Sequence, residues 1–523
     1  MSIFRSPFPD IEVPDQDLTG FVLHRAGELG DKPAVIDAAS GQGYTYAELA
    51  TAVDRLAAGL AERGLGVGDV IALMSPNIPE FPIVFLGALR AGVSVTTPNP
   101  LYQRDELAHQ LRDSRARLLF TVAEQAEKAQ GASEADGVAV DQVVIIDDPD
   151  AAVGLAAVSS DGPVPHPSID PAVDIAALPY SSGTTGLPKG VMLTHRNLVA
   201  NVLQTHGNQK LVEDDVVLAV LPFFHIYGMT VTMNYCLWMG ATVVTTRRYD
   251  PKTFPAILAD YGVTRLYAAP PIILNLAKSE DLGQYDLSKL RGVLSGAAPL
   301  DAETAAAGSA KLRCRVTQGY GMTELSPCSH LTTLNDTNTP AASIGPALAS
   351  TECKIVDPES GRELGPDEPG ELLIRGPQVM RGYLNNEEAT RSTIDEDGFL
   401  HTGDLAKVDA NGYYYILDRL KELIKFKGFQ IAPAELEAVV VGHEAVLDAA
   451  VIGVQDPEAG EIPKALVVTS RPIEAQEIID YVAGRVAPHK KVRQVEFIDA
   501  IPKSASGKIL RRELRDRERQ ATV

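Results

Sequence analysis

The chain has 523 residues, of which 45% are hydrophobic and 22% charged, and its formal net charge at pH 7 is −22. This length predicts roughly three to four domain-sized units with enough apolar material for a large core. The acidic balance argues against a surface that binds nucleic acid or an anionic membrane. The four cysteines show neither CxxC pairing nor metal-ligand spacing. With no signal-peptide pattern and no membrane-spanning apolar run, we expect reduced thiols in a cytoplasmic protein.

Strand and helix patterns alternate through the first 170 residues. Thr45-Tyr46-Ala47-Glu48 is a capping box that opens a helix with Leu49, Val53 and Leu56 on one face. Further strands are expected at 70–74, 93–95 and 118–120, with helices starting at Phe81 and covering 105–112. This alternation predicts a parallel α/β sheet with helices on both faces. The stretch 150–170, rich in Ser, Pro, Gly and Ala, predicts a surface linker.

The next stretch, Tyr180-Ser181-Ser182-Gly183-Thr184-Thr185-Gly186-Leu187-Pro188-Lys189-Gly190-Val191, follows the apolar run Ile175–Leu178. Its glycines allow backbone N–H groups to approach a ligand closely, and its hydroxyls and lysine add donors. That chemistry suits phosphate, although Pro188-Lys189 does not have the Walker A spacing. A solvated Gly/Ser/Thr-rich surface turn is the alternative reading of this loop by itself.

The remainder of the chain divides into three regions with different sequence patterns. Strand patterns at 216–221, 241–245, 264–268 and 292–294, with helices such as 255–261, predict a second doubly wound sheet over 171–341. From about 342 to 418, short apolar runs broken by Gly and Pro predict a small antiparallel barrel. Beyond Asp418, about a hundred residues of mixed helix and strand pattern have the size of a separate small domain. The predicted fold is therefore α/β, with an N-terminal domain of residues 1–418 (two sheets, roughly 1–170 and 171–341, plus a β-barrel) and an α+β C-terminal domain of residues 419–523.

Eight stretches, counting the glycine-rich loop, match the pattern of the adenylate-forming superfamily in the order that this pattern requires. The other seven are Pro222–Gly228, Ser295–Leu300, Gln318–Glu324, Gly370–Tyr383, His401–Asp404, Asp418–Glu435 and Ser506–Leu510. Over roughly residues 20 to 515 the chain thus resembles this superfamily of acyl-CoA ligases, luciferases and peptide-synthetase adenylation domains. Within it, the run from Lys421 to Glu437 resembles 4-coumarate:CoA ligases most.

The resemblance implies an ATP-dependent carboxylic acid:CoA ligase that uses ATP, Mg²⁺ and CoA. A carboxylate attacks the α-phosphate and leaves an acyl-adenylate, and the CoA thiol then displaces AMP. Two anions meet in the first step, so cations are expected where charge accumulates. By resemblance, Lys508 spans the carboxylate and the α-phosphate, whereas by itself it would be a solvated lysine in a basic tail.

The resemblance also assigns residues to the nucleotide. Glu324 would ligate Mg²⁺, a hard cation that prefers one or two carboxylates together with phosphate oxygens; outside its motif, it would be a helix-start carboxylate. Asp404 would accept from both ribose hydroxyls, and as an isolated Gly-Asp it would be a turn residue. The implied ATP and AMP residues are Ser181, Ser182, Gly183, Thr184, Thr185 and Lys189 in the loop, and Gln318, Gly319, Tyr320, Thr323, Asp404, Arg419 and Lys421 elsewhere.

For the second half-reaction, the family rotates a mobile C-terminal domain about a hinge, here implied at Asp418–Lys421. Lys508 would leave the site while Lys425 and Gln430 arrive. CoA would meet Lys427, Gly428 and Arg248, and His225 would gate the passage between acyl pocket and CoA tunnel. On composition alone, the lysines are a solvated surface and His225 is a packed core residue.

The implied acyl pocket has small and apolar walls with one phenol. Its residues are Tyr227, Val231, Leu294, Ala297, Gly319, Gly321, Pro327 and Cys328. Such walls favour a flat ring, and a hydroxycinnamate such as 4-coumarate is the expected acid. A medium-chain fatty acyl-CoA ligase with the same mechanism is the alternative, and a non-catalytic nucleotide-binding protein is a remote one. We expect small-molecule partners only, with the protein a monomer or a weak homodimer.

Overall fold

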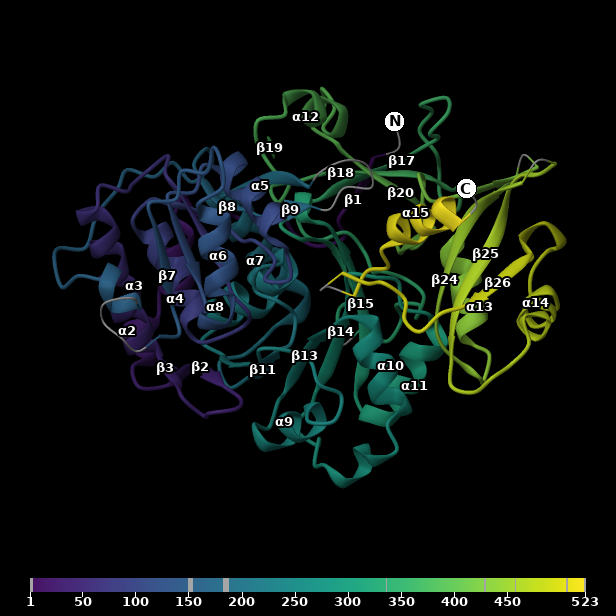
Figure 1. Cartoon of the computed structure of the whole chain (residues 1–523), viewed down its shortest axis with the longest axis horizontal. Helices are drawn as coiled ribbons and strands as arrows, with labels where there is room; N and C mark the ends of the chain where they lie inside the picture. The colour runs from purple at the N-terminus through teal and green to yellow at the C-terminus, as the bar shows by residue number, and fades with distance from the viewer. Residues whose placement is uncertain are drawn as a thin grey trace.

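The structure is a computed structural model that describes residues 3–148, 154–181, 188–334, 336–427, 429–456, 458–504 and 507–521. Figure 1 shows a large body coloured purple to green and a C-terminal part coloured yellow beside it. Four sheets organise the described residues, two of them with eight strands and two with five. The expected alternation of strands and helices, with a separate α+β unit near the C-terminus, is confirmed.

The first sheet has the strand order β19-β10-β8-β5-β4-β6-β7, with β9 paired to β10. Its central strands from β8 to β7 are parallel, while β9, β10 and β19 run antiparallel to their neighbours. The strands are β4 (Val70–Met74), β5 (Ser94–Thr96), β6 (Leu118–Thr121), β7 (Gln142–Ile145), β8 (Ile175–Leu178), β9 (Tyr180–Ser181), β10 (Lys189–Thr194) and β19 (Gly382–Tyr383).

Helices cover both faces of this sheet because successive side chains of β4 point in opposite directions. Ile71 and Leu73 belong to the core that contains the apolar faces of α3 and α4, whereas Ala72 and Met74 pack with α5 and α6. Thr45 caps α3 with the predicted capping box. The helices are α1 (Leu18–Val22), α2 (Ala26–Leu29), α3 (Tyr46–Glu62), α4 (Glu80–Arg90), α5 (Arg104–Ser114), α6 (Ala126–Ser133) and α7 (His195–Gln209).

The second sheet has the order β16-β15-β14-β13-β11-β12-β2-β3, parallel except at its two ends. Its strands are β2 (Pro33–Asp37), β3 (Gly43–Thr45), β11 (Val216–Ala219), β12 (Thr242–Thr245), β13 (Arg265–Ala268), β14 (Gly292–Ser295), β15 (Arg315–Gly321) and β16 (Cys328–Leu331). One face packs on α9 (Phe254–Asp260), α10 (Pro270–Lys278) and α11 (Ala302–Leu312). The other face shares the core of the first sheet through the π-helix Gly228–Asn234 and α8 (Tyr235–Trp238).

Strand pairing crosses the subdomain division expected near residue 170. β2 and β3 come from the first fifty residues but pair in the second sheet, and β8 to β10 follow residue 170 but pair in the first. Local periodicity identifies a strand without identifying its neighbour, which is set by packing between distant segments. The boundaries of the folding units therefore remain predictions.

The third sheet is antiparallel and follows the order β1-β17-β18-β20-β21. Its strands are β1 (Phe4–Arg5), β17 (Glu352–Val356), β18 (Gly370–Arg375), β20 (Leu400–Val408) and β21 (Tyr414–Arg419), and α12 (Glu387–Thr393) lies beside it. It takes the place of the expected barrel as an open sheet, because its edge strands β1 and β21 pair with inner strands and not with each other.

The C-terminal part forms a sheet of order β23-β22-β25-β24, with β26 parallel to β25. Its elements are β22 (Ile424–Phe426), β23 (Phe429–Ile431), β24 (Val446–Asp456), β25 (Gly460–Thr469), β26 (Gln494–Phe497), α13 (Pro433–Val441), α14 (Ala475–Ala483) and α15 (Arg511–Ala521). The apolar side chains form two clusters made up of residues beyond 423 alone. A core of its own is what allows such a unit to move as a body.

Short 3₁₀ turns complete the described chain: η1 (Ala123–Gln125), η2 (Leu155–Val158), η4 (Asp281–Gln284), η5 (Thr323–Leu325) and η6 (Pro488–Lys490). A search of the described residues found no helix with the length and apolar character needed to cross a membrane.

Candidate active site

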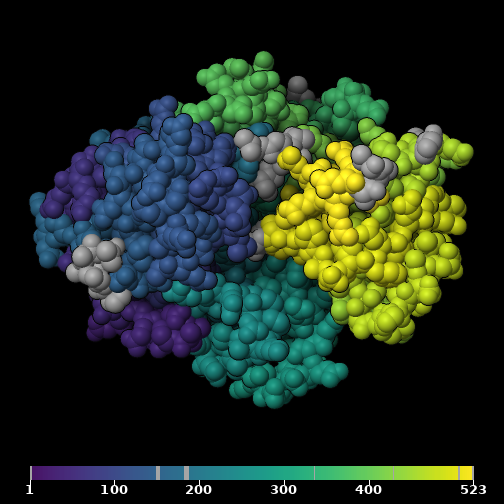
Figure 2. All heavy atoms as spheres, in the orientation of Figure 1, coloured from purple at the N-terminus to yellow at the C-terminus, as the bar shows by residue number. Residues whose placement is uncertain are grey.

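A cavity of about 900 Å³ lies where the large body meets the C-terminal part. Figure 2 shows a recess between the blue surface of the large body and the yellow C-terminal surface. Its walls come from the carboxyl end of β15, the turn η5, the stems β9 and β10, the strands β19 to β21, and the residues Lys503, Ser504, Lys508, Leu510 and Glu513 of the C-terminal part. Ligands in open α/β sheets bind outside the carboxyl ends of the strands, so the position suits a binding site.

Both cationic and acidic side chains line the cavity, the acidic ones being Glu106, Glu324, Glu371 and Glu513. Five cationic side chains contribute to its described lining: Lys189, Arg419, Lys421, Lys503 and Lys508. They come from three separate regions of the chain, and so only tertiary structure brings them together. Clustered cations with low-dielectric walls concentrate an anionic ligand.

Lys508 reaches this cavity from the C-terminal part. Gly507 precedes it with φ of +84°, and a Cβ on Gly507 would lie 3.2 Å from Cβ of Ala269 at the start of α10. The loop is closed by a hydrogen bond from Ser504 N to Lys508 O of 2.8 Å. Burial, reinforced by the charge of Arg419, lowers the pKa of Lys508 to about 8.

Asp404 and Arg419 lie opposite each other on β20 and β21. Their ion pair measures 3.4 Å from Nε to Oδ1, and the hydroxyl of Tyr320 donates to the other oxygen of Asp404. Asp404 is buried, and burial raises the pKa of its carboxyl despite the guanidinium. Arg419 and Tyr320 line the cavity, with Asp404 directly behind them.

Glu324 and Thr323 belong to the 3₁₀ turn η5 and both line the cavity. Glu324 is 5% exposed, and its Oε1 accepts a hydrogen bond of 2.9 Å from the hydroxyl of Tyr383. The described residues hold no group of three or more His, Cys, Asp or Glu side chains that could bind a metal ion without other ligands. A single carboxylate fits Mg²⁺ only where phosphate oxygens or water complete the shell.

The predicted phosphate loop is described at its stems. Ser181 and Lys189 pair across β9 and β10 and both line the cavity, whereas Ser182, Gly183, Thr184 and Thr185 lie outside the described residues. Tyr180 secures the stem, because its hydroxyl donates to Oδ2 of Asp113 on α5 at 2.6 Å. The described stems of the predicted loop thus form part of the cavity wall.

The predicted acyl residues form one wall of the same cavity. Tyr227, Ala297, Gly319, Gly321, Pro327 and Cys328 all line it. The ring of Tyr227 lies against Gly296, where an added Cβ would be 2.8 Å from a ring carbon, and its hydroxyl is 3.3 Å from the carbonyl of Leu294. Leu294 and Val231 are buried behind this wall.

His225 lies beside this wall and within electrostatic reach of Lys508. Its Nδ1 accepts from Tyr227 N at 3.2 Å, which leaves Nε2 as the protonated nitrogen of the neutral ring. Removal from water, and secondarily the charge of Lys508, lowers the pKa of His225 to about 4. The side chain is therefore neutral at pH 7 and lines the cavity.

Several predicted residues lie away from the cavity. Gln318 is buried, and its amide binds the backbone of Leu300 and Ala341. The residues expected in the second half-reaction or at CoA are exposed: Lys425, Gln430, Lys427 and Arg248. Gly428 lies outside the described residues.

The cavity also contains residues that the sequence analysis did not single out. Tyr383 ends one of the matched stretches without a predicted role, and Tyr180 opens another; both line the wall near Glu324 and Lys189. Glu371 accepts from Gly403 N at 3.1 Å and from His401, which holds the turn before Asp404. The sequence could have indicated Tyr383 as a site residue only through its position at the end of the matched stretch Gly370–Tyr383.

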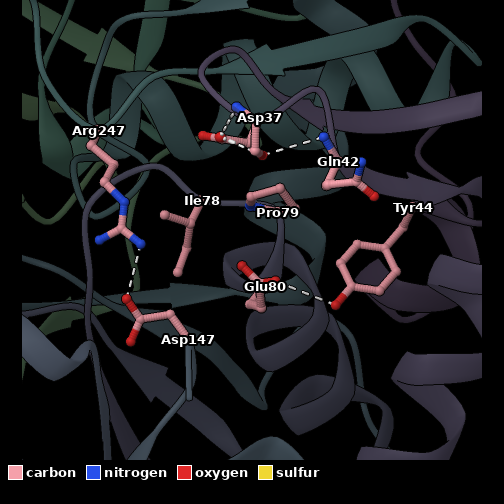
Figure 3. A pocket seen from close by; sticks show the side chains of 10 residues that line it. Asp37, Gln42, Tyr44, Ile78, Pro79, Glu80, Asp147 and Arg247 are labelled. Atoms are coloured by element: carbon pink, nitrogen blue, oxygen red, sulfur yellow. Dashed lines mark hydrogen bonds and ion pairs between the residues drawn. The ribbon is translucent and has the colours of Figure 1, made fainter. Parts of the chain in front are cut away.

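A second, smaller cavity of about 300 Å³ lies near the carboxyl ends of β2, β7 and β12. In Figure 3, Arg247 pairs with Asp147 on one side and Tyr44 with Glu80 on the other, with Ile78 and Pro79 between them. None of the predicted site residues lines it. Each of its charged groups already has a partner, because Asp37 accepts from Ser40 in addition to the two contacts just named.

Comparison with known proteins places the chain among relatives of similar length. The model for AMP-binding enzymes matches residues 22–384, and that for the AMP-binding enzyme C-terminal domain matches 435–508. A 4-coumarate–CoA ligase of Pinus taeda is 42% identical over 98% of this chain and 97% of that protein. Another, from Oryza sativa subsp. japonica, is 43% identical with the same coverage.

Solved structures agree in fold. ATP-bound MatB from Rhodopseudomonas palustris superposes with a TM-score of 0.85 at 30% identity, covering 96% of this chain and 99% of that one. The anthranilate CoA ligase AuaEII, in complex with anthranoyl-AMP, gives 0.89 at 25% identity, with 97% and 98% covered.

Proposed function

The chain belongs to the family of AMP-binding enzymes, and we propose that it joins hydroxycinnamates such as 4-coumarate to CoA. It is an AMP-forming acid–thiol ligase that uses ATP, Mg²⁺ and CoA and proceeds through an acyl-adenylate. One observation carries the proposal: a single cavity is lined both by the cations Lys189, Arg419 and Lys508 and by the small and apolar residues around Tyr227.

In the first half-reaction, Lys508 compensates two anions that must approach each other. Its ammonium stands on the nucleotide side of the cavity, and its lowered pKa reflects a water-poor place where a charge interacts strongly. Asp404 and Arg419 hold the ribose, Gly319 and Tyr320 frame the adenine together with the backbone of Gln318, and Thr323 meets the α-phosphate. Ser181, Lys189, Lys421 and the loop residues 182–185 bind the other phosphates. Glu324 would hold Mg²⁺ together with phosphate oxygens, and the metal would supply neutralisation of phosphate charge there.

In the second half-reaction, the C-terminal domain rotates about Asp418–Lys421. The support is a hairpin that holds Lys425 and Gln430 in solvent while Lys508 occupies the cavity. Lys508 and the hairpin residues Lys425 and Gln430 cannot occupy the same cavity wall at once. Rotation therefore removes Lys508 from the wall and brings the hairpin there, which creates the second site. Lys427, Gly428 and Arg248 then receive CoA, and the neutral His225 separates the acyl group from the thiol's path.

The acyl wall supports an aromatic acid. Tyr227 supplies a phenol in a wall made of small and apolar residues, and none of the predicted acyl residues carries a charge. A second carboxylate, as in malonate, would be buried there without a partner, which is costly. A ring hydroxyl would instead meet the hydroxyl of Tyr227.

The test is acyl-CoA formation by the purified protein with ATP, Mg²⁺ and CoA. The acids are cinnamate, 4-coumarate, caffeate, benzoate, hexanoate, octanoate and malonate, and kcat/KM is compared. Highest kcat/KM for the hydroxycinnamates is expected. A preference for octanoate would reject the aromatic acid while keeping the mechanism, and absence of ATP–pyrophosphate exchange with every acid would reject the ligase reaction.

We place the reaction in the cytoplasm and expect a monomer or a weak homodimer. Support for the compartment is that all four cysteines are free, three of them buried, as in a reducing environment. Sedimentation at micromolar concentrations checks the oligomeric state.

A further inference from the structure

Tyr383 is the side chain at which two groups of the nucleotide side of the cavity meet. Its hydroxyl donates to Oε1 of Glu324 at 2.9 Å. Nζ of Lys189 lies 4.9 Å from the centroid of its ring. All three residues line the cavity, and Tyr383 is 7% exposed. One phenol therefore contacts an anion through its polar end and a cation through its face.

The backbone around Tyr383 holds the same two regions. Val191 of β10 pairs with Tyr383, and Leu384 N donates to Gly190 O at 2.8 Å, next to Lys189. Two residues before Gly382, Met380 N donates to the carbonyl of Glu324 at 2.9 Å. The five residues 380–384 thus link the turn that carries Glu324 to the strand that leaves the phosphate loop.

The position of Tyr383 is itself restrained. Tyr383 N donates to Oγ1 of Thr390 on α12 at 2.9 Å. Gly382 has φ of +150°, and a Cβ there would lie 2.8 Å from a methyl carbon of Thr390, so this close approach requires glycine.

We propose that Tyr383 is a positioning residue that sets the metal-binding orientation of Glu324 and holds Lys189 beside the same phosphates. The hydrogen bond to Oε1 restricts rotation of the carboxylate, so less freedom is lost when the metal binds. The ring keeps the Lys189 ammonium at a fixed place near that carboxylate. This inference rests on the proposed function, in which Glu324 would hold Mg²⁺ and Lys189 binds phosphate.

The test measures binding rather than turnover. Calorimetry gives the Kd of α,β-methylene-ATP, an analogue that cannot release pyrophosphate, once with Mg²⁺ and once with EDTA. The Kd in EDTA divided by the Kd in Mg²⁺ is the metal-dependent gain in affinity. Tyr383→Phe, which keeps the ring, should reduce this gain about fivefold or more. Tyr415→Phe is the matched control, because its hydroxyl binds Asp409 at 3.1 Å outside the cavity, and it should leave the gain within about twofold.

A double-mutant cycle separates positioning from general damage. In a Glu324→Gln background the gain should be small, and adding Tyr383→Phe should change it no further, because the hydroxyl acts through that carboxylate. Tyr383→Leu should additionally weaken binding in EDTA, since Lys189 loses the ring. A partly unfolded fraction lowers the number of sites in both titrations alike, so the ratio remains interpretable.

Three outcomes contradict an assignment. An unchanged gain in Tyr383→Phe, or an equal fractional loss in the Glu324→Gln background, would overturn the role of Tyr383. A wild-type protein that shows no metal-dependent gain would instead overturn the proposed function, so the two failures are distinguishable.

Discussion

Lys508 illustrates how strongly one residue depends on its surroundings. In the basic run that ends the chain it would be an ordinary solvated lysine, yet the structure packs its loop against α10 and places its ammonium in the cavity. Burial lowers its pKa to about 8, close to the range in which enzymes work. Its charge is therefore present below that pH and is lost as pH rises through it.

Adenylation should accordingly depend on the charge of Lys508. We expect kcat/KM for ATP in ATP–pyrophosphate exchange to fall as pH rises above about 8, towards tenfold per pH unit. Lys508→Ala should lose about 100-fold or more at pH 7. In Lys508→Arg, whose guanidinium keeps its charge, any remaining activity should persist to higher pH. An unchanged exchange rate in Lys508→Ala would contradict the role.

We expect the hydroxyl of Tyr227 to form a hydrogen bond with the ring hydroxyl of the acid. The Tyr227 hydroxyl makes only a 3.3 Å contact with the carbonyl of Leu294, and is thus available to a substrate. Tyr227→Phe should lower kcat/KM for 4-coumarate about five- to tenfold, the usual worth of one hydrogen bond. Cinnamate, which lacks the hydroxyl, is the internal control and should change little. Equal losses for both acids would mean that the residue only shapes the pocket.

At the scale of elements, the hairpin of β22 and β23 shows why Lys425 and Gln430, the pair proposed for the second half-reaction, lie on the surface. Ile424 and Ile431 face each other in the core, while the adjacent cross-strand pair Lys425 and Gln430 is exposed on the opposite face. Alternation along a strand makes this outcome unavoidable. The same alternation presents both polar side chains together to whatever the hairpin meets.

This hairpin should matter to the second half-reaction alone. Lys425→Ala or Gln430→Ala should slow acyl-CoA formation from a preformed acyl-adenylate about tenfold or more. ATP–pyrophosphate exchange should stay within about twofold, because neither residue lines the cavity. Lys311→Ala, an exposed lysine on α11, is the control for loss of a surface charge. Equal loss in both half-reactions would show that the second conformation is misassigned.

At the scale of the whole molecule, the buried neutral side chain of His195 makes the stability of the fold depend on pH. His195 is 2% exposed, accepts from Leu18 N at 3.1 Å, and burial lowers its pKa to about 4. An unfolded histidine titrates near 6.5, so the unfolded chain binds more protons between these values. Stability from the neutral ring is complete above pH 6.5 and declines as pH falls towards 4.

Replacing His195 should therefore flatten part of the pH dependence of unfolding. Between pH 7 and pH 5, wild type should lose about 2 kcal/mol more of its free energy of unfolding than His195→Gln. Urea unfolding at the two pH values measures this difference. His166→Gln, at an exposed site, should behave as wild type. A parallel decline in wild type and His195→Gln would show that His195 does not carry this dependence.

The sequence by itself determined the family, the alternation of strands and helices, and part of the cavity lining. Those features are local: the capping box of Thr45 and Glu48 lies within four residues, and the stretches around Glu324 and Asp404 carry their chemistry in consecutive positions. Backbone preference and side-chain type act over such short spans, which is why they could be read without a structure.

Only the tertiary structure decided which of these residues meet. Lys508 lies in a cavity whose other lining residues come mainly from the large body, whereas Lys425 and Gln430 lie outside it. The strands β2 and β3, which come early in the chain, pair in the second sheet and not in the first. The tertiary structure also joined Tyr383 to both Glu324 and Lys189. Such contacts depend on strand pairing and burial between distant segments, and no local pattern encodes the partner.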